Sequence, residues 1–120
     1  MSYEYSVDSD RRLVRVRMRG TLTRAEILRL VQELIEDPRV SPGISQLIDL
    51  TEASSAAIAA DDVRHIASAD LDPVSRRAFV TPDSLTFGLA RMFESLREIK
   101  HAPEQIAVFT TLQEAEAWLA

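Results

Sequence analysis

Short apolar runs alternate with amphipathic stretches along the chain, in the order β-β-α-β-α-β-α-β-α. Residues 3–8 and 13–19 alternate apolar and polar side chains, which is typical of strands with one buried and one wet face. Three further apolar runs, at 44–50, 77–81 and 105–110, each follow a helix-like segment and predict parallel strands. The pattern therefore predicts an α/β fold with a five-stranded, mostly parallel sheet and helices packed mainly on one of its faces.

The helix-like segments have start signals and apolar stripes. Thr23 and Thr111 are each followed three residues later by glutamate, a capping-box pattern that marks a helix start. The Asp72-Pro73 pair is expected to end the second helix. No linker separates the elements, so we expect a single domain over residues 1–120. The longest helix, about 84–99, has a predicted buried stripe of Leu85, Leu89, Met92, Phe93 and Leu96.

Composition narrows the classes of function. The chain has no cysteine, which excludes disulfides, thiolate metal sites and cysteine nucleophiles. A net charge of −5 argues against a nucleic-acid binder, whose surface is usually basic. No apolar stretch is long enough to span a membrane and the start lacks a signal pattern, so we expect a cytoplasmic protein.

Catalytic signatures are missing from the sequence. The two histidines, His65 and His101, lie in or beside helices, outside any nucleophile–base motif, and we expect both on the surface. The chain contains no Walker loop, dinucleotide-binding fingerprint, zinc-protease motif or serine-hydrolase motif. We therefore expect no cofactor and no metal site, and a non-enzymatic role is favoured over a carboxylate base at Asp49.

One candidate ligand site lies where the third predicted strand ends. In open parallel sheets, ligands gather at the carboxyl ends of the strands, where Asp49 and Thr51 are expected. A carboxylate within an apolar run is costly to bury without hydrogen bonds. Asp49 therefore either accepts bonds from the following loop, which is a structural role, or faces a ligand.

Two serines follow in the segment expected to be a loop before the second helix. Ser54 or Ser55 is a candidate phosphoacceptor, because phosphate is electrostatically favoured near a helix N-terminus. The simpler interpretation is a polar, flexible loop.

A candidate interface lies on the longest predicted helix. Phe87 is expected opposite the apolar stripe, with Arg91 four residues on and therefore within reach. An aromatic residue beside an arginine on a wet face can anchor a protein contact, although a single exposed aromatic also occurs without function.

Five arginines crowd into nine residues of the first hairpin. Such a patch either binds phosphate, nucleic acid or an acidic partner, or forms a solvated sheet face with Glu4 and Asp8 as counter-charges. We favour the solvated face, because aromatic residues for base stacking are missing there. The arginines are Arg11, Arg12, Arg15, Arg17 and Arg19.

Four sequence segments are distinctive: Q-L-I-D-L-T, R-R-A-F-V, F-G-L-A-R-M-F-E and I-A-V-F-T-T-L-Q-E-A-E-A-W-L. They resemble the SpoIIAA-like, STAS-related family of small bacterial proteins of unassigned function. The resemblance covers nearly the whole chain and implies a β-α superhelical fold with one sheet face partly open. Family members that antagonise anti-sigma factors have a phosphorylated serine in a D-S-S-G-like segment, where this chain has Ala57 to Ala60. The wider fold includes lipid-carrying Sec14-type domains, but this chain is short for their deep apolar pocket.

These observations leave two hypotheses about function. The first is a non-enzymatic regulatory or protein-interaction module of STAS-like type, working as a homodimer or with a protein partner. The contact would involve Phe87, Arg91 and Glu94, or the segment 51–62. The alternative is a protein that binds a small apolar or anionic ligand, with Asp49 and Thr51 at the rim of the site. The sequence identifies neither the partner nor the ligand.

Overall fold

The computed structural model of the chain describes residues 2–69, 74–100 and 104–120. Its strands form one sheet in the order β1-β2-β3-β4-β5, in which β1 and β2 are antiparallel and every other pair is parallel. The predicted α/β fold and element order are confirmed. Asp72, Pro73 and His101 lie outside the described residues. The elements are β1 (Tyr3–Asp8), β2 (Leu13–Thr21), α1 (Arg24–Glu36), β3 (Ser45–Ser54), α2 (Ala60–Ser68), β4 (Arg76–Val80), α3 (Ser84–Ile99), β5 (Gln105–Phe109) and α4 (Leu112–Leu119).

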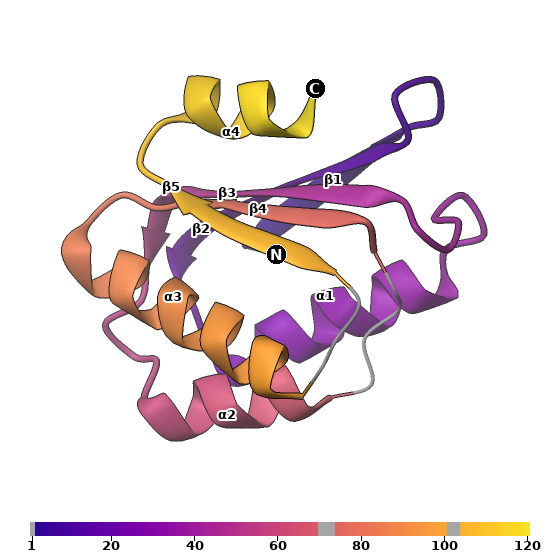
Figure 1. Cartoon of the computed structure of the whole chain (residues 1–120). Helices are drawn as coiled ribbons and strands as arrows, with labels where there is room; N and C mark the ends of the chain where they lie inside the picture. The colour runs from indigo at the N-terminus through magenta and orange to yellow at the C-terminus, as the bar shows by residue number, and fades with distance from the viewer. Residues whose placement is uncertain (1, 70–73, 101–103) are drawn as a thin grey trace.

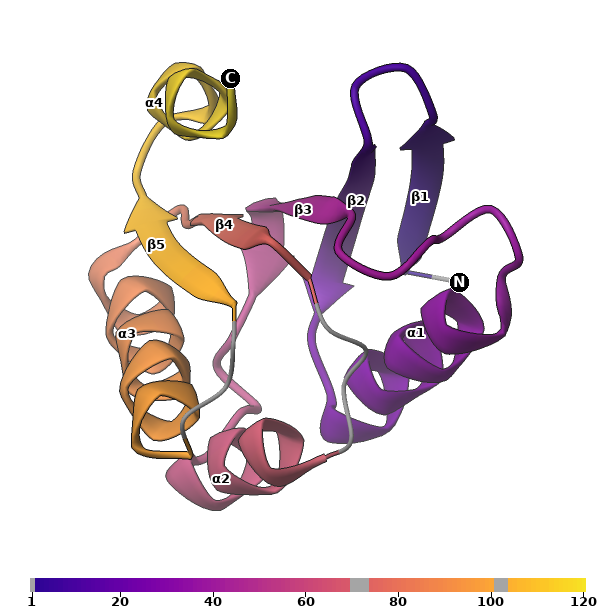
Figure 2. The same cartoon turned by 45° about the vertical axis from the view of Figure 1, so that its right-hand side comes forward.

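Helices α1, α2 and α3 form a layer on one face of the sheet, whereas α4 lies on the other face (Figures 1 and 2). The apolar face of β2 packs toward the three-helix layer, and its residues Val14, Val16 and Met18 are buried as predicted. The helices therefore cover mainly one face, and α4 is the exception.

Helix α4 docks on the second face because the central strands are apolar on both sides. Leu47 of β3 and Val80 of β4 are buried against Ala115 of α4. Trp118 lies 5.7 Å from the ring centroid of Phe109, and the guanidinium of Arg76 lies 5.3 Å from the Trp118 ring. These contacts hold the last helix over β4 and β5.

Strand β3 ends four residues later than the sequence predicts. It continues to Ser54 because β2 also continues, through a bulge between Arg17 and Arg19, and the two strands stay paired as far as Thr21 and Ser54. The segment expected to be a loop after Leu50 is therefore partly strand.

Most of the predicted stripe of helix α3 is confirmed, because Leu89, Met92, Phe93 and Leu96 pack in one apolar cluster. Leu85 is 55% exposed, so its predicted burial is wrong. Thr86 and Arg97 are also buried, which apolar periodicity does not reveal. The predicted caps of α1 and α4 are confirmed, because the hydroxyls of Thr23 and Thr111 accept hydrogen bonds from main-chain N–H groups three residues on.

Candidate functional site

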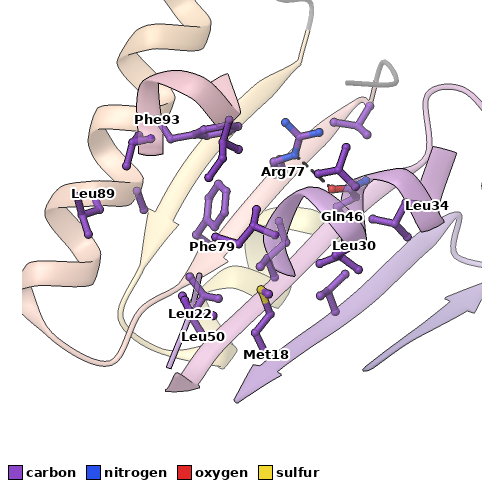
Figure 3. A pocket seen from close by; sticks show the side chains of 18 of the residues that line it. Met18, Leu22, Leu30, Leu34, Gln46, Leu50, Arg77, Phe79, Leu89 and Phe93 are labelled. Carbon is purple, nitrogen blue, oxygen red and sulfur yellow. Dashed lines mark hydrogen bonds between the residues drawn. The ribbon is translucent and has the colours of Figure 1, made fainter. Parts of the chain in front are cut away.

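An apolar cavity of about 160 Å³ lies between the sheet and the three-helix layer (Figure 3). Its wall combines side chains from strands and helices that are distant in the sequence. Figure 3 shows Met18 from β2, Leu30 from α1 and Leu89 and Phe93 from α3 around the same space. The cavity belongs to the core and lies on the face of the sheet opposite α4.

One end of the cavity wall is polar. Gln46 and Arg77 are register partners on the neighbouring strands β3 and β4, and both are buried. The Nε of Arg77 donates a hydrogen bond to Oε1 of Gln46 at 3.2 Å, drawn as the dashed line in Figure 3. The same guanidinium lies 5.8 Å from the centroid of the Phe93 ring. A permanent cation therefore contributes to a wall that is otherwise almost wholly apolar.

Arg77 belongs to a buried ionic cluster that also contains Arg97 and Glu104. Nη1 of Arg77 donates to Oε1 of Glu104 at 3.1 Å. Arg97 donates two hydrogen bonds to the same carboxylate, from Nε to Oε1 at 2.7 Å and from Nη2 to Oε2 at 3.2 Å. Nη1 of Arg97 donates to the carbonyl of Ala67 near the end of α2. The cluster thus joins α2, α3, β4 and the residue before β5.

Charges in this cluster do not cancel. Two guanidinium groups share one carboxylate, and all three side chains are almost fully buried. Burial lowers the pKa of Arg77 to about 10, and the nearby Arg97 adds to this effect, so Arg77 remains charged at neutral pH. Burial alone would raise the pKa of Glu104, but the hydrogen bond from Arg97 and the charge of Arg77 hold it below its ordinary value.

A second polar pair lies at the cavity wall. The hydroxyls of Ser55 and Thr86 are 2.7 Å apart, and both side chains are buried. Ser54 is exposed at the end of β3, and its Oγ accepts a hydrogen bond from the N–H of Ala56. The two serines therefore have different environments, and phosphorylation of either stays a prediction.

Asp49 and Thr51 lie on the opposite face of the sheet from the cavity. Because β3 continues to Ser54, Asp49 is inside the strand and not at its carboxyl end. Its Oδ1 accepts bonds from the N–H of Thr51 at 2.9 Å and from the hydroxyl of Thr51 at 2.6 Å. Its other oxygen is 3.8 Å from Nε of Arg17. These contacts agree with the structural alternative for Asp49, but the carboxylate also lines a second, more polar pocket with Arg15 and Arg17, so its role in ligand binding stays a prediction.

Phe87 and Arg91 lie on α3 away from the cavity. Phe87 is half-buried, and Arg91 is exposed with its Nε 3.5 Å from Oε1 of Glu94. Asp49 contacts Thr51 on the other face of the sheet, whereas Ser55 contacts Thr86, which precedes Phe87 on α3, so the predicted site residues fall into separate groups.

The arginine-bearing face of β2 is balanced by carboxylates. Glu4, predicted as a counter-charge, is 2.9 Å from Nη2 of Arg19, and Glu52 is 3.1 Å from its Nε. Arg15 pairs with Glu116 of α4. Asp8 instead accepts a hydrogen bond from the N–H of Arg11. Exposed pairs of this kind contribute little to stability, and together they form the solvated face that we favoured.

The sequence pattern missed the polar end of the cavity. The pattern predicts Arg77 within a strand and assigns no role to Arg77, Arg97 or Glu104. One signal was available: β4 is a central parallel strand, and such strands are apolar on both faces, so an arginine within it requires a buried partner. Nothing local identifies Glu104 as that partner.

Within residues 2–69, 74–100 and 104–120, no group of three or more histidine, aspartate or glutamate side chains is arranged to hold a metal ion. In the same part of the chain, no helix is long and apolar enough to cross a membrane.

A mostly parallel sheet, a three-helix layer enclosing an apolar cavity and a single helix on the other face define a small α/β protein with an internal ligand-sized space. The chain belongs to the SpoIIAA-like family, whose model matches residues 13–120. The family suggested by the sequence is therefore confirmed. No curated protein matches the chain.

A solved structure supports the same fold. It is the crystal structure of an uncharacterized protein from the DUF3478 family with a SpoIIAA-like fold, from Shewanella loihica PV-4. The two structures align with a TM-score of 0.61 and 19% sequence identity, over 99% of this chain and 94% of that chain. At this level of identity the similarity establishes the fold and leaves the function open.

Proposed function

We propose that the protein binds a small apolar molecule in the cavity between the sheet and helices α1, α2 and α3. The observation that supports this proposal is the cavity of about 160 Å³ within the core. The proposal keeps the ligand-binding hypothesis and moves its site from the strand edge near Asp49 to the other face of the sheet.

The apolar lining of the cavity favours this function. Most of the side chains that line it are aliphatic or aromatic. An apolar molecule that enters the cavity leaves water and gains about 25 cal/mol for each Å² of apolar surface that it buries.

Cavity volume also limits the ligand. An engineered apolar cavity of about 150 Å³ binds benzene, whereas drug-sized ligands occupy about 300–1,000 Å³. The cavity in this protein therefore suits a molecule of about six to eight non-hydrogen atoms, which agrees with the expectation that the chain lacks a deep lipid pocket. Ile35 and Ser41 line the cavity and are also exposed, which gives a route from the surface near the end of α1.

Benzene is a suitable probe for this proposal. We expect benzene to raise the melting temperature and to shift backbone amide resonances around the cavity. Ala90→Leu adds three carbons at a buried position on the cavity wall and should abolish both effects while the protein stays folded. Ala117→Leu makes the same change at an exposed position of α4 and should leave both effects intact. Equal benzene responses in the two variants would contradict the proposal.

A protein-interaction module remains the second candidate. The observation in its favour is the exposure of Leu85, 55%, close to the half-buried Phe87 at the start of α3. A homodimer through this surface would have twice the 13.4 kDa mass of the chain in light scattering. Phe87→Ala should then lower the measured mass, and an unchanged mass would exclude this surface as the contact.

A further inference from the structure

We propose that the ligand has a carboxylate group and that Arg77 binds it at the polar end of the cavity. This inference rests on the proposed function and specifies the chemical class of the ligand as a short monocarboxylate with an apolar chain. Three features of the molecule favour this class of ligand: the net charge of the buried cluster, the hydrogen-bond donors at the cavity wall and the volume of the cavity.

Among residues 2–69, 74–100 and 104–120, Glu104 is the carboxylate that pairs with both Arg77 and Arg97, and Arg77 is the cation that it balances less fully. Glu104 is held by two hydrogen bonds from Arg97, one to each oxygen, and by one from Arg77. Arg97 therefore satisfies the carboxylate in a bidentate pair, and the cluster keeps one positive charge in excess. A buried cation without a counter-charge is costly, so an anion beside Arg77 is strongly favoured.

Hydrogen-bond donors at this end of the cavity are available for such an anion. Arg77 uses Nε for Gln46 and Nη1 for Glu104, and no residue within 2–69, 74–100 or 104–120 accepts a hydrogen bond from its Nη2. The carbonyl oxygen of Gln46 faces Arg77, so its Nε2 group is a second donor, and it too has no acceptor in these parts of the chain. Both side chains are more than nine-tenths buried and line the cavity.

Two donors suit the two oxygens of a carboxylate, which this proposal places beside Arg77 and Gln46. A carboxylate accepts hydrogen bonds and donates none, and bonds from a guanidinium to a carboxylate are about twice as strong as neutral ones. Volume then fixes the remainder of the molecule, because about 160 Å³ leaves room for a chain of about four to six carbons. Phe93 and Met18 supply the apolar wall for that chain (Figure 3).

Pentanoate and pentan-1-ol form a matched pair of probes, because they share the apolar chain and differ in charge. We expect isothermal titration calorimetry at neutral pH to show pentanoate binding at least tenfold more tightly than pentan-1-ol. Arg77→Met keeps an unbranched side chain as far as the position of Nε, removes the charged group, and leaves both hydrogen bonds from Arg97 to Glu104 in place. In this variant the preference for pentanoate should disappear while pentan-1-ol still binds.

Two further variants keep the test decisive. Gln46→Met removes the second donor and should reduce the preference for pentanoate. This variant replaces Arg77→Met as the test if Arg77→Met does not fold. Arg91→Met removes an exposed arginine of α3 and should leave the preference unchanged.

The possible outcomes separate the two proposals. Equal binding of both probes, or tighter binding of pentan-1-ol, would overturn the carboxylate assignment and leave the apolar site standing. A preference for pentanoate that persists in Arg77→Met would exclude Arg77 as its source. If neither probe nor benzene binds, both proposals fail.

Discussion

Glu104→Gln offers the sharpest test of the buried ionic cluster. The carboxylate accepts three hydrogen bonds, at 3.1 Å from Arg77 and at 2.7 Å and 3.2 Å from Arg97. The amide has nearly the same shape but no charge, and its NH2 group faces donors. The substitution therefore leaves two buried guanidinium groups side by side without a counter-charge.

Breaking a buried ion pair by removing one partner costs about 3–5 kcal/mol. We expect Glu104→Gln to lower the free energy of unfolding by this amount, measured by urea denaturation. For a chain of this length, 1 kcal/mol corresponds to about 3–5 °C in melting temperature, so the melting temperature should fall by about 10–20 °C. Since total stability is about 5–15 kcal/mol, the variant is expected to be marginally folded.

Two further variants test whether the loss of stability in Glu104→Gln comes from unbalanced buried charge. Glu98→Gln makes the same change at an exposed position of α3 and should alter stability by less than about 0.5 kcal/mol. Adding Arg77→Met to Glu104→Gln removes one of the two unbalanced cations and should recover part of the loss. A loss below about 1 kcal/mol in Glu104→Gln, or no recovery in the double variant, would refute the view that Glu104 neutralises buried charge.

Other parts of the structure give further predictions. In the native state the pKa of Glu104 lies below its ordinary value of 4.5, so the unfolded chain binds a proton there more readily. Stability should therefore fall as the pH drops below about 4.5. Glu104→Gln should remove this part of the pH dependence, measured as an acid titration followed by circular dichroism. Trp118→Ala removes the contacts with Phe109 and Arg76 and should cost about 2–3 kcal/mol in calorimetry, less than for a fully buried tryptophan. Ser55→Ala leaves the buried hydroxyl of Thr86 without its partner and should cost about 1–2 kcal/mol in guanidinium denaturation, and adding Thr86→Val should restore part of it.

The fold could be predicted because its signals are local. Alternation of valine and arginine in β2, and the caps at Thr23 and Thr111, depend on residues a few positions apart. The face on which a helix docks is not local. Placement of α4 depends on Leu47 and Val80, which present apolar side chains on the face that we expected to be open.

The candidate site could not be predicted, because its partners are distant in the sequence. Gln46 and Arg77 are 31 residues apart and become neighbours through strand register, and Glu104 is 27 residues beyond Arg77. A polar residue in a short apolar run has two interpretations at Asp49, a structural role or contact with a ligand. The same pattern at Arg77 has more physical weight, since a guanidinium in a central parallel strand has no route to water.

The cavity and the ionic cluster meet at one side chain, Arg77, which lines the cavity and pairs with Glu104. A ligand that fills the cavity and neutralises the cation binds the native state and not the unfolded chain. At ligand concentrations well above Kd, it therefore raises the free energy of unfolding in proportion to the logarithm of the ratio of concentration to Kd. Pentanoate should therefore raise the melting temperature of the wild-type protein more than pentan-1-ol at equal concentration. Arg77→Met should bring the two shifts together by reducing only the shift produced by pentanoate.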